Sequence, residues 1–98
     1  MRIRYSPSAT RDIASIHRYL TDHSPAGATN VMAAILAAVE FVRRNPLAAE
    51  MTTIRDVRGK IVRRYKFKVF YRLLAEEGVV EIVHVRHTSR KPWSGEEG

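Results

Sequence analysis

The chain has 98 residues, 45% of them hydrophobic, a formal net charge of +7 and no cysteine. The missing cysteines exclude disulfides, thiolate metal sites and cysteine nucleophiles, and the histidines lack metal-ligand spacing, so we expect neither a metal nor a cofactor. The length predicts one domain over residues 1–93, with a flexible tail over 94–98. No apolar run approaches the roughly 20 residues of a membrane span, so we expect a cytoplasmic protein.

The first half predicts a short strand and two helices. Residues 2–5 alternate polar and apolar side chains, which is typical of a strand. Ser-Pro pairs at 6–7 and 24–25 are typical helix starts. Serine can cap the first turn, and the N–H that proline lacks would have no hydrogen-bond partner in that turn. Apolar residues then recur at helical spacing, which predicts helices over about 7–22 and 25–44, the second stopped by an Asn-Pro pair.

The second half predicts a sheet. From Tyr65 to Leu73 apolar residues alternate with mostly cationic ones, so one strand face should pack on the helices and the other should present charge. The Glu-Glu-Gly turn at 76–78 allows an antiparallel partner over 79–86. A further strand is expected over 52–57 or 60–64, with Arg58-Gly59 as a turn. The order β, α, α, β, β, β predicts an α+β fold, with a helical hairpin on a small, mainly antiparallel sheet.

Positive charge is concentrated in one part of the chain. Residues 55–91 hold eleven Lys and Arg against four Asp and Glu. A solvated basic surface without function is one interpretation, and the alternatives are a nucleic acid or an acidic protein as partner. The cations lie on predicted strands and not along a helix face, which argues against a helix that reads DNA.

Several residues with chemical potential also have structural uses. His84 lies inside an apolar strand and is expected to be a hydrogen-bonded structural residue. His87 ends that strand, where it can cap a backbone group or take part in chemistry. Tyr65 and Tyr71 are expected in the core, and Trp93 is expected to close the edge of the sheet, with stacking on a base as the alternative.

Together these elements resemble a known family. The strand that begins at Tyr65, the strand Val-Glu-Ile-Val-His-Val with its ending His87-Thr-Ser-Arg90, and the helix that begins Ser6-Pro-Ser-Ala-Thr-Arg are similar to the RelE/ParE superfamily of bacterial type II toxins. The resemblance covers about residues 2–93, and the first helix resembles the ParE-like branch. It implies a growth-inhibiting toxin that a small cognate antitoxin neutralises.

The superfamily contains two mechanisms, and both remain open for this chain. The ParE-like interpretation implies inhibition of DNA gyrase, and the RelE-like interpretation implies ribosome-dependent cleavage of mRNA. Lys68 stands where RelE-like strands carry arginine, Ile61-Val62 replace closely spaced lysines, and no tyrosine follows Arg90, so the residues favour the ParE-like action. A third alternative is a non-toxic basic module that binds nucleic acid.

These interpretations assign candidate site residues. For a nuclease, the tentative catalytic group comprises His87, Arg64, Lys68 and Arg90. The candidate target-binding residues are Arg63, Arg64, Lys66, Lys68, Arg86 and Arg90. The second helix carries more apolar residues than one packed face needs, so an antitoxin-binding groove is expected at Val31, Ile35, Val39 and Phe41. The alternatives are a homodimer contact or simply a wide contact with the sheet.

Overall fold

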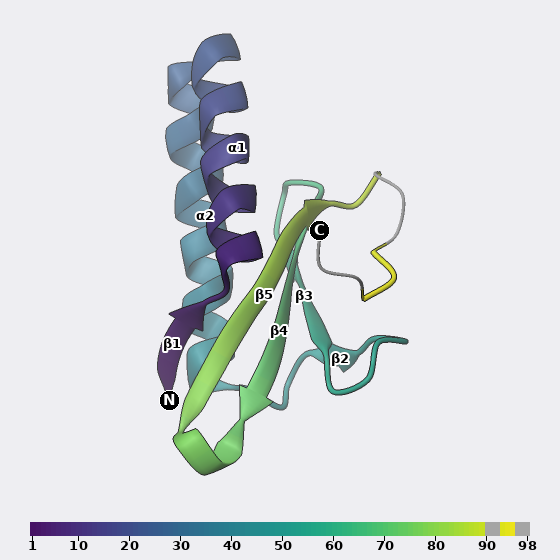
Figure 1. Ribbon diagram of the computed structural model, residues 1–98. Helices are drawn as coiled ribbons and strands as arrows, with labels where there is room; N and C mark the ends of the chain where they lie inside the picture. The colour runs from purple at the N-terminus through teal and green to yellow at the C-terminus, as the bar shows by residue number, and fades with distance from the viewer. Residues whose placement is uncertain (90–92, 96–98) are drawn as a thin grey trace.

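The computed structural model describes residues 1–89 and 93–95 (Figure 1). Its elements in chain order are β1 (Arg2–Tyr5), α1 (Pro7–His23), α2 (Pro25–Arg44), β2 (Glu50–Met51), β3 (Arg58–Val62), β4 (Phe67–Leu74), the 3₁₀ turn η1 (Ala75–Glu77) and β5 (Val79–His87). The strands form one sheet in the order β1-β5-β4-β3-β2, in which only the β1–β5 pair is parallel. The predicted hairpin on a mainly antiparallel sheet is confirmed.

The two Ser-Pro pairs start the helices as predicted. The Ser6 hydroxyl accepts a hydrogen bond from the Ala9 N–H (3.0 Å), and the Ser24 hydroxyl accepts one from the Gly27 N–H (3.1 Å). Each proline occupies the first turn, where its missing N–H leaves no gap in the hydrogen-bond pattern. Both helices therefore begin at a proline and run antiparallel to each other (Figure 1).

The region between α2 and β4 differs from the prediction. Arg58 and Gly59 lie inside β3 and do not form a turn, and β2 is an additional strand of only two residues. The chain reverses at residues 63–66, where Arg64 has a φ of 72°. The guanidinium of Arg58 explains part of this arrangement, because it donates to the carbonyls of Leu47 and Ala49 and ties β3 to the segment after α2.

The core lies between the hairpin and one face of the sheet. Its buried side chains come mainly from α2, β3, β4 and β5, and include Ile35, Val42, Val62, Val69, Tyr71, Ile82 and Val85. The side chain of Tyr71 is fully buried and its hydroxyl donates to the Pro46 carbonyl at 2.7 Å. Tyr65 is half-buried and packs against this cluster. Burial of these apolar groups is the main driving force that joins the two layers.

Helix α2 is long and apolar enough to cross a membrane, with 20 residues and a mean hydropathy of 1.5. Its apolar stripe is nevertheless part of the core, because six of its residues, Ala28, Val31, Ile35, Ala38, Val39 and Val42, are buried against α1 and the sheet. A buried core helix meets the same criterion of length and composition. The hydropathy of α2 therefore reflects its packing inside this fold.

Candidate target-binding surface

The hairpin covers one face of the sheet and leaves the other face open over β3, β4 and β5 (Figure 1). Alternation along β4 places Lys68 and Phe70 on this open face. Across the antiparallel pair they lie opposite Arg86 and His84 of β5. The open face therefore combines a pair of cations with a pair of aromatic rings.

Lys68 lies flat across the sheet because Gly59 has no side chain. A Cβ atom at Gly59 would overlap with the Cε of Lys68, so the lysine stem passes directly over the β3 backbone. The ammonium lies 5.4 Å from the centre of the Phe70 ring, whose negative face attracts a cation. The position of this charge is set by β3 and β4 together.

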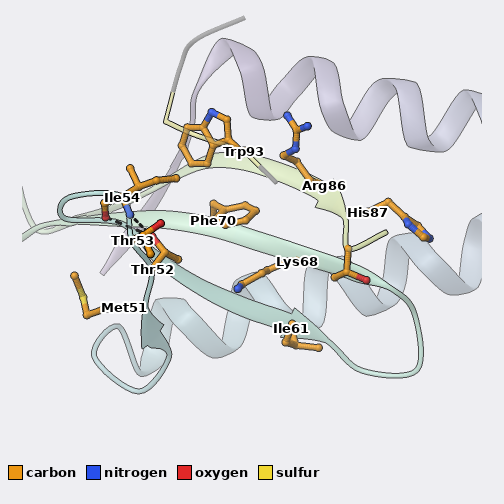
Figure 2. Close-up of a pocket in the computed structure, with 11 residues that line it drawn as sticks. Met51, Thr52, Thr53, Ile54, Ile61, Lys68, Phe70, Arg86, His87 and Trp93 are labelled. Carbon is orange, nitrogen blue, oxygen red and sulfur yellow. Dashed lines mark hydrogen bonds between the residues drawn. The ribbon is translucent and has the colours of Figure 1, made fainter. Parts of the chain in front are cut away.

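A cavity of about 650 Å³ opens on this face (Figure 2). We call it the open-face cavity; it is lined by Met51, Thr52, Thr53, Ile54, Ile61, Lys68, Phe70, Arg86, His87, Thr88 and Trp93. Three predicted site residues, Lys68, Arg86 and His87, meet around it. Ile54 and Ile61 add apolar walls, so the cavity suits a partner that offers both negative charge and apolar surface.

Trp93 lies on the open face and not at the sheet edge where it was expected. Its ring packs edge-on against Phe70, with ring centres 5.3 Å apart, and against His84, at 4.4 Å. We call Phe70 and His84 the aromatic shelf. Edge-to-face contacts between aromatic rings add stabilisation beyond that of the buried area alone. The backbone at the edge of the sheet has no ring and would not give Trp93 this stabilisation.

His84 is a structural residue, as predicted, and its partner is Asp12 of α1. The Asp12 Oδ2 lies 2.7 Å from the His84 Nδ1 and accepts a second hydrogen bond from the Val85 N–H at 3.0 Å. Strand β1 pairs with β5 only as far as Ile82, so Asp12 replaces the missing strand partner at Val85. Within the described part of the chain, the His84 Nε2 is buried and has no hydrogen-bond partner.

His87 both caps a backbone group and lines the open-face cavity. Its Nδ1 lies 3.2 Å from the Ser89 backbone nitrogen and 2.5 Å from the Ser89 hydroxyl. Because a backbone N–H can only donate, Nδ1 is the acceptor, and a neutral ring carries its proton on Nε2. An edge-to-face contact with Phe67, with ring centres 5.1 Å apart, holds the imidazole at the end of β5.

The other predicted cations lie at the turn between β3 and β4. Arg63, Arg64 and Lys66 are exposed there. Two further cavities adjoin this turn, one beside α2 lined by Asn30, Ala33, Ala34, Ala37, Ala38, Phe41, Lys60, Ile61, Arg63, Arg64 and Tyr65. The other lies beside α1 and is lined by Asp12, Ser15, Ile16, Tyr19, Leu20, Val31, Arg64, Tyr65, Lys66, Phe67, Val85, Arg86 and His87; we call it the α1 groove. These three cations border the helical hairpin, Lys68 lines only the open-face cavity, and Arg86 lines both the open-face cavity and the α1 groove.

The predicted antitoxin residues are divided by the fold. Val31, Ile35 and Val39 are at most 5% exposed and belong to the core. Of these three only Val31 reaches a surface groove, where it lines the α1 groove. Phe41 is 39% exposed, and the ammonium of Lys60 lies 4.2 Å from its ring centre. Periodicity placed all four residues on an apolar helix, but only packing against the sheet separates those inside from those at the surface.

Ion pairs balance the charge at the far end of the sheet. Arg4 bridges Glu77 and Glu81, both at 3.3 Å, and the hydrogen bond that its guanidinium donates to Glu77 raises the pKa of Arg4. Arg72 lies 3.9 Å from the same Glu81. Exposed pairs of this kind contribute little stability. Their effect is to leave the positive charge of the sheet concentrated around the open-face cavity and the β3–β4 turn.

The remaining predictions concern metals and Arg90. Among residues 1–89 and 93–95, no three His, Asp or Glu side chains group closely enough to hold a metal ion. Arg90 lies outside the described residues, as do residues 96–98 of the predicted tail. Sequence reasoning missed Gly59 and Ile54. A glycine inside an alternating run is a known signal of close approach and could have revealed Gly59, whereas Ile54 reaches the cavity from a loop.

Solved structures share the fold of this chain. A chain of the chromosomal ParDE TA system from P. aeruginosa matches with a TM-score of 0.78 at 17% identity, covering 91% of this chain and 97% of that chain. A chain of the intact E. coli RelBE toxin-antitoxin complex matches with a TM-score of 0.64 at 13% identity, covering 91% and 98%. A chain of the RelBE2 toxin-antitoxin complex from Mycobacterium tuberculosis matches with a TM-score of 0.60 at 21% identity, covering 88% and 95%.

These likenesses establish that this chain shares the fold of those ParDE and RelBE chains. The family model for the ParE toxin of the type II toxin-antitoxin system parDE matches residues 3–92, and the chain therefore belongs to the ParE toxin family. No curated protein matches the sequence. The resemblance inferred from the strands and from the first helix is confirmed.

Proposed function

We propose that this chain inhibits DNA gyrase by docking the open face of its sheet onto the enzyme, and that a small cognate antitoxin neutralises it. The match of residues 3–92 to the ParE toxin family carries the proposal. The open-face cavity supports it, because Lys68 and Arg86 stand beside the apolar walls Ile54 and Ile61. Interfaces between proteins combine an apolar centre with charged groups in this way.

Cleavage of mRNA is the second candidate, because Lys68, Arg86 and His87 line one cavity. Metal-free cleavage needs a group that moves protons and cations that stabilise the charge on the phosphate. In this structure, however, Ser89 engages the Nδ1 of His87, and Trp93 covers the aromatic shelf. Both features favour a docking surface over a site that is ready for chemistry.

The α1 groove is the surface that best suits an antitoxin. Its volume is about 720 Å³, and its apolar wall includes Ile16, Tyr19 and Leu20 of α1. Its opposite wall carries the cations Arg64 and Lys66. An amphipathic helix with one apolar and one acidic side would match both walls, and charge complementarity would speed its association.

A supercoiling assay with purified gyrase tests the target. The wild-type chain should inhibit supercoiling. Lys68→Gln should need about tenfold more protein for the same inhibition, as for the loss of one contact worth roughly 1.4 kcal/mol. The exposed control Arg18→Gln on α1 should inhibit as well as wild type.

Induction of the chain in bacteria should stop growth and raise an SOS response, and co-expression of the neighbouring reading frame should relieve both effects. Loss of ribosome-bound mRNA without gyrase inhibition would establish the nuclease instead. Salt-sensitive binding of nucleic acid without growth arrest would instead support the interpretation as a non-toxic basic module that binds nucleic acid.

Charge reversal tests the antitoxin surface separately. Lys66→Glu should weaken the complex with the product of the neighbouring reading frame by at least about tenfold, because a repulsive carboxylate would face the acidic partner. Arg18→Glu makes the same charge change on an exposed face of α1 away from the groove and should have little effect. Equal losses in the two variants would remove the α1 groove from the interface.

A further inference from the structure

One of the chain's own residues already fills the aromatic shelf. Trp93 packs against both Phe70 and His84, with interplanar angles of 71° and 64°. Two residues later Gly95 has a φ of 97°, and a Cβ there would lie 3.3 Å from the Cγ2 of Ile54. Trp93 and Ile54 line the same end of the open-face cavity (Figure 2), so the segment 93–95 connects the shelf with the Ile54 wall.

The charge around this contact is complementary to the sequence on the C-terminal side of Trp93. Lys68 and Arg86 line the same cavity as Trp93. Two carboxylates, Glu96 and Glu97, come directly after Gly95 in the sequence. An aromatic shelf beside two cations should select a ligand that carries an aromatic ring followed by acidic residues, and the chain's own segment from Trp93 onward has this composition.

We infer that the aromatic shelf is a recognition subsite for an aromatic side chain within an acidic segment of a protein partner, and that Trp93 occupies the subsite in cis until the partner displaces it. The inference rests on the proposed function in one respect, that the open face binds a protein. It does not require that protein to be gyrase. The partner binds only molecules whose shelf is vacant, so its apparent affinity is its intrinsic affinity multiplied by the fraction of such molecules.

The contact in cis can be tested directly, because Trp93 is the single tryptophan of the chain. In wild type its emission should be blue-shifted and protected from quenching by acrylamide. Phe70→Ala should shift the emission to the red and at least double the quenching constant, whereas Tyr19→Ala, at an exposed site on α1, should change neither. Circular dichroism confirms that each variant is folded. A wild-type tryptophan that is already fully accessible to acrylamide would overturn the inference.

A test in trans uses the peptide of residues 91–98 as the probe. Trp93→Ala contains no tryptophan, so emission from the peptide reports its binding to the vacated shelf. We expect a saturable blue shift with Trp93→Ala, several-fold weaker binding of a labelled peptide to wild type, and weaker binding when both glutamates of the peptide are glutamine. Lack of saturation at millimolar peptide, or equal affinity for the two proteins, would overturn the inference.

The two proposals can fail independently. If gyrase is the partner, Trp93→Ala should inhibit supercoiling at several-fold lower concentration than wild type, because the competing ring is gone. If wild type does not inhibit gyrase while the peptide prefers the Trp93→Ala chain, the gyrase proposal fails and the shelf remains a protein-recognition subsite. If both chains inhibit gyrase equally and the peptide shows no preference, the subsite proposal is rejected and the gyrase proposal is kept.

Discussion

The Tyr71 hydroxyl is a single polar group that links β4 to the segment after α2. The side chain is fully buried, and the hydroxyl donates to the Pro46 carbonyl at 2.7 Å. Burial raises the pKa of this phenol, because the charged phenolate would lose its hydration, while the nearby Arg58 acts in the opposite direction. The folded protein therefore favours the neutral, hydrogen-bonded form.

Tyr71→Phe should lower the free energy of unfolding by about 1 kcal/mol at neutral pH, the usual loss for one hydrogen bond. The difference from wild type should shrink as the pH rises above about 10, because the unfolded chain ionises first and the raised pKa keeps the folded phenol neutral. Urea titrations at several pH values measure this. Tyr19→Phe, at a side chain that is 62% exposed, is the control. A difference that stays constant from neutral to strongly alkaline pH would contradict the assignment.

Gly59 acts on function through the position of Lys68. Gly59→Ala introduces a Cβ that collides with the flexible lysine stem, so the stem should move at a stability cost below about 1 kcal/mol. Gyrase inhibition should nevertheless fall about as far as in Lys68→Gln, and the double variant should lose little more, since both changes displace one ammonium. Urea unfolding and the supercoiling assay separate the two effects. Additive losses in the double variant would show that Gly59 acts independently of Lys68.

At the scale of elements, the two helix caps have the same sequence signature and different surroundings. Ser6 is buried, and besides capping α1 its hydroxyl donates to the Val83 carbonyl of β5 at 2.9 Å. Ser24 caps α2 at an exposed site. The first cap is therefore also a link between a helix and the sheet, and the second is only local.

Ser24→Ala should cost about 1 kcal/mol of unfolding free energy, the typical value of a lost helix cap. Ser6→Ala should cost about 2 kcal/mol, because it also leaves the buried Val83 carbonyl without its donor. Urea titration of the two variants at one pH measures the difference, and each serves as the control for the other. Equal costs would mean that the Ser6–Val83 hydrogen bond adds nothing to the cap.

The elements also show where local patterns lose predictive power. The helix bounds were predictable from two Ser-Pro pairs, and Gly78 adopts the positive φ, 66°, that its turn requires. Strand β2 has only two residues, too short for any periodicity, and exists because β3 offers it an edge. Arg58-Gly59 resembled a turn in sequence but became a strand, since Arg58 has carbonyl partners outside its own segment.

On the scale of the whole molecule, the net charge of +7 is unevenly distributed. Ion pairs neutralise the end of the sheet near Arg4, while cations gather around the open-face cavity and the β3–β4 turn. Such a field speeds the encounter with acidic partners and is screened by salt. The same positive charge can therefore attract both the target and the antitoxin.

Association of the chain with its antitoxin should slow by about tenfold between low and high salt, because screening removes the electrostatic steering while apolar contacts persist. Stopped-flow mixing at a series of ionic strengths measures the association and dissociation rates separately. The dissociation rate should change much less than the association rate. A salt-independent association rate would show that the basic surface does not guide this encounter.

The sequence by itself determined both helices and their caps, the alternation of β4, the turn at Gly78 and the concentration of charge, because each depends on neighbours a few residues apart. Tertiary structure alone decided the parallel β1–β5 pair, the position of Lys68 over Gly59 and that of Trp93 on the aromatic shelf. The bond between Asp12 and His84 joins residues separated by 72 positions, and no local period encodes such a contact. It forms only because folding places α1 along the part of β5 that β1 leaves uncovered.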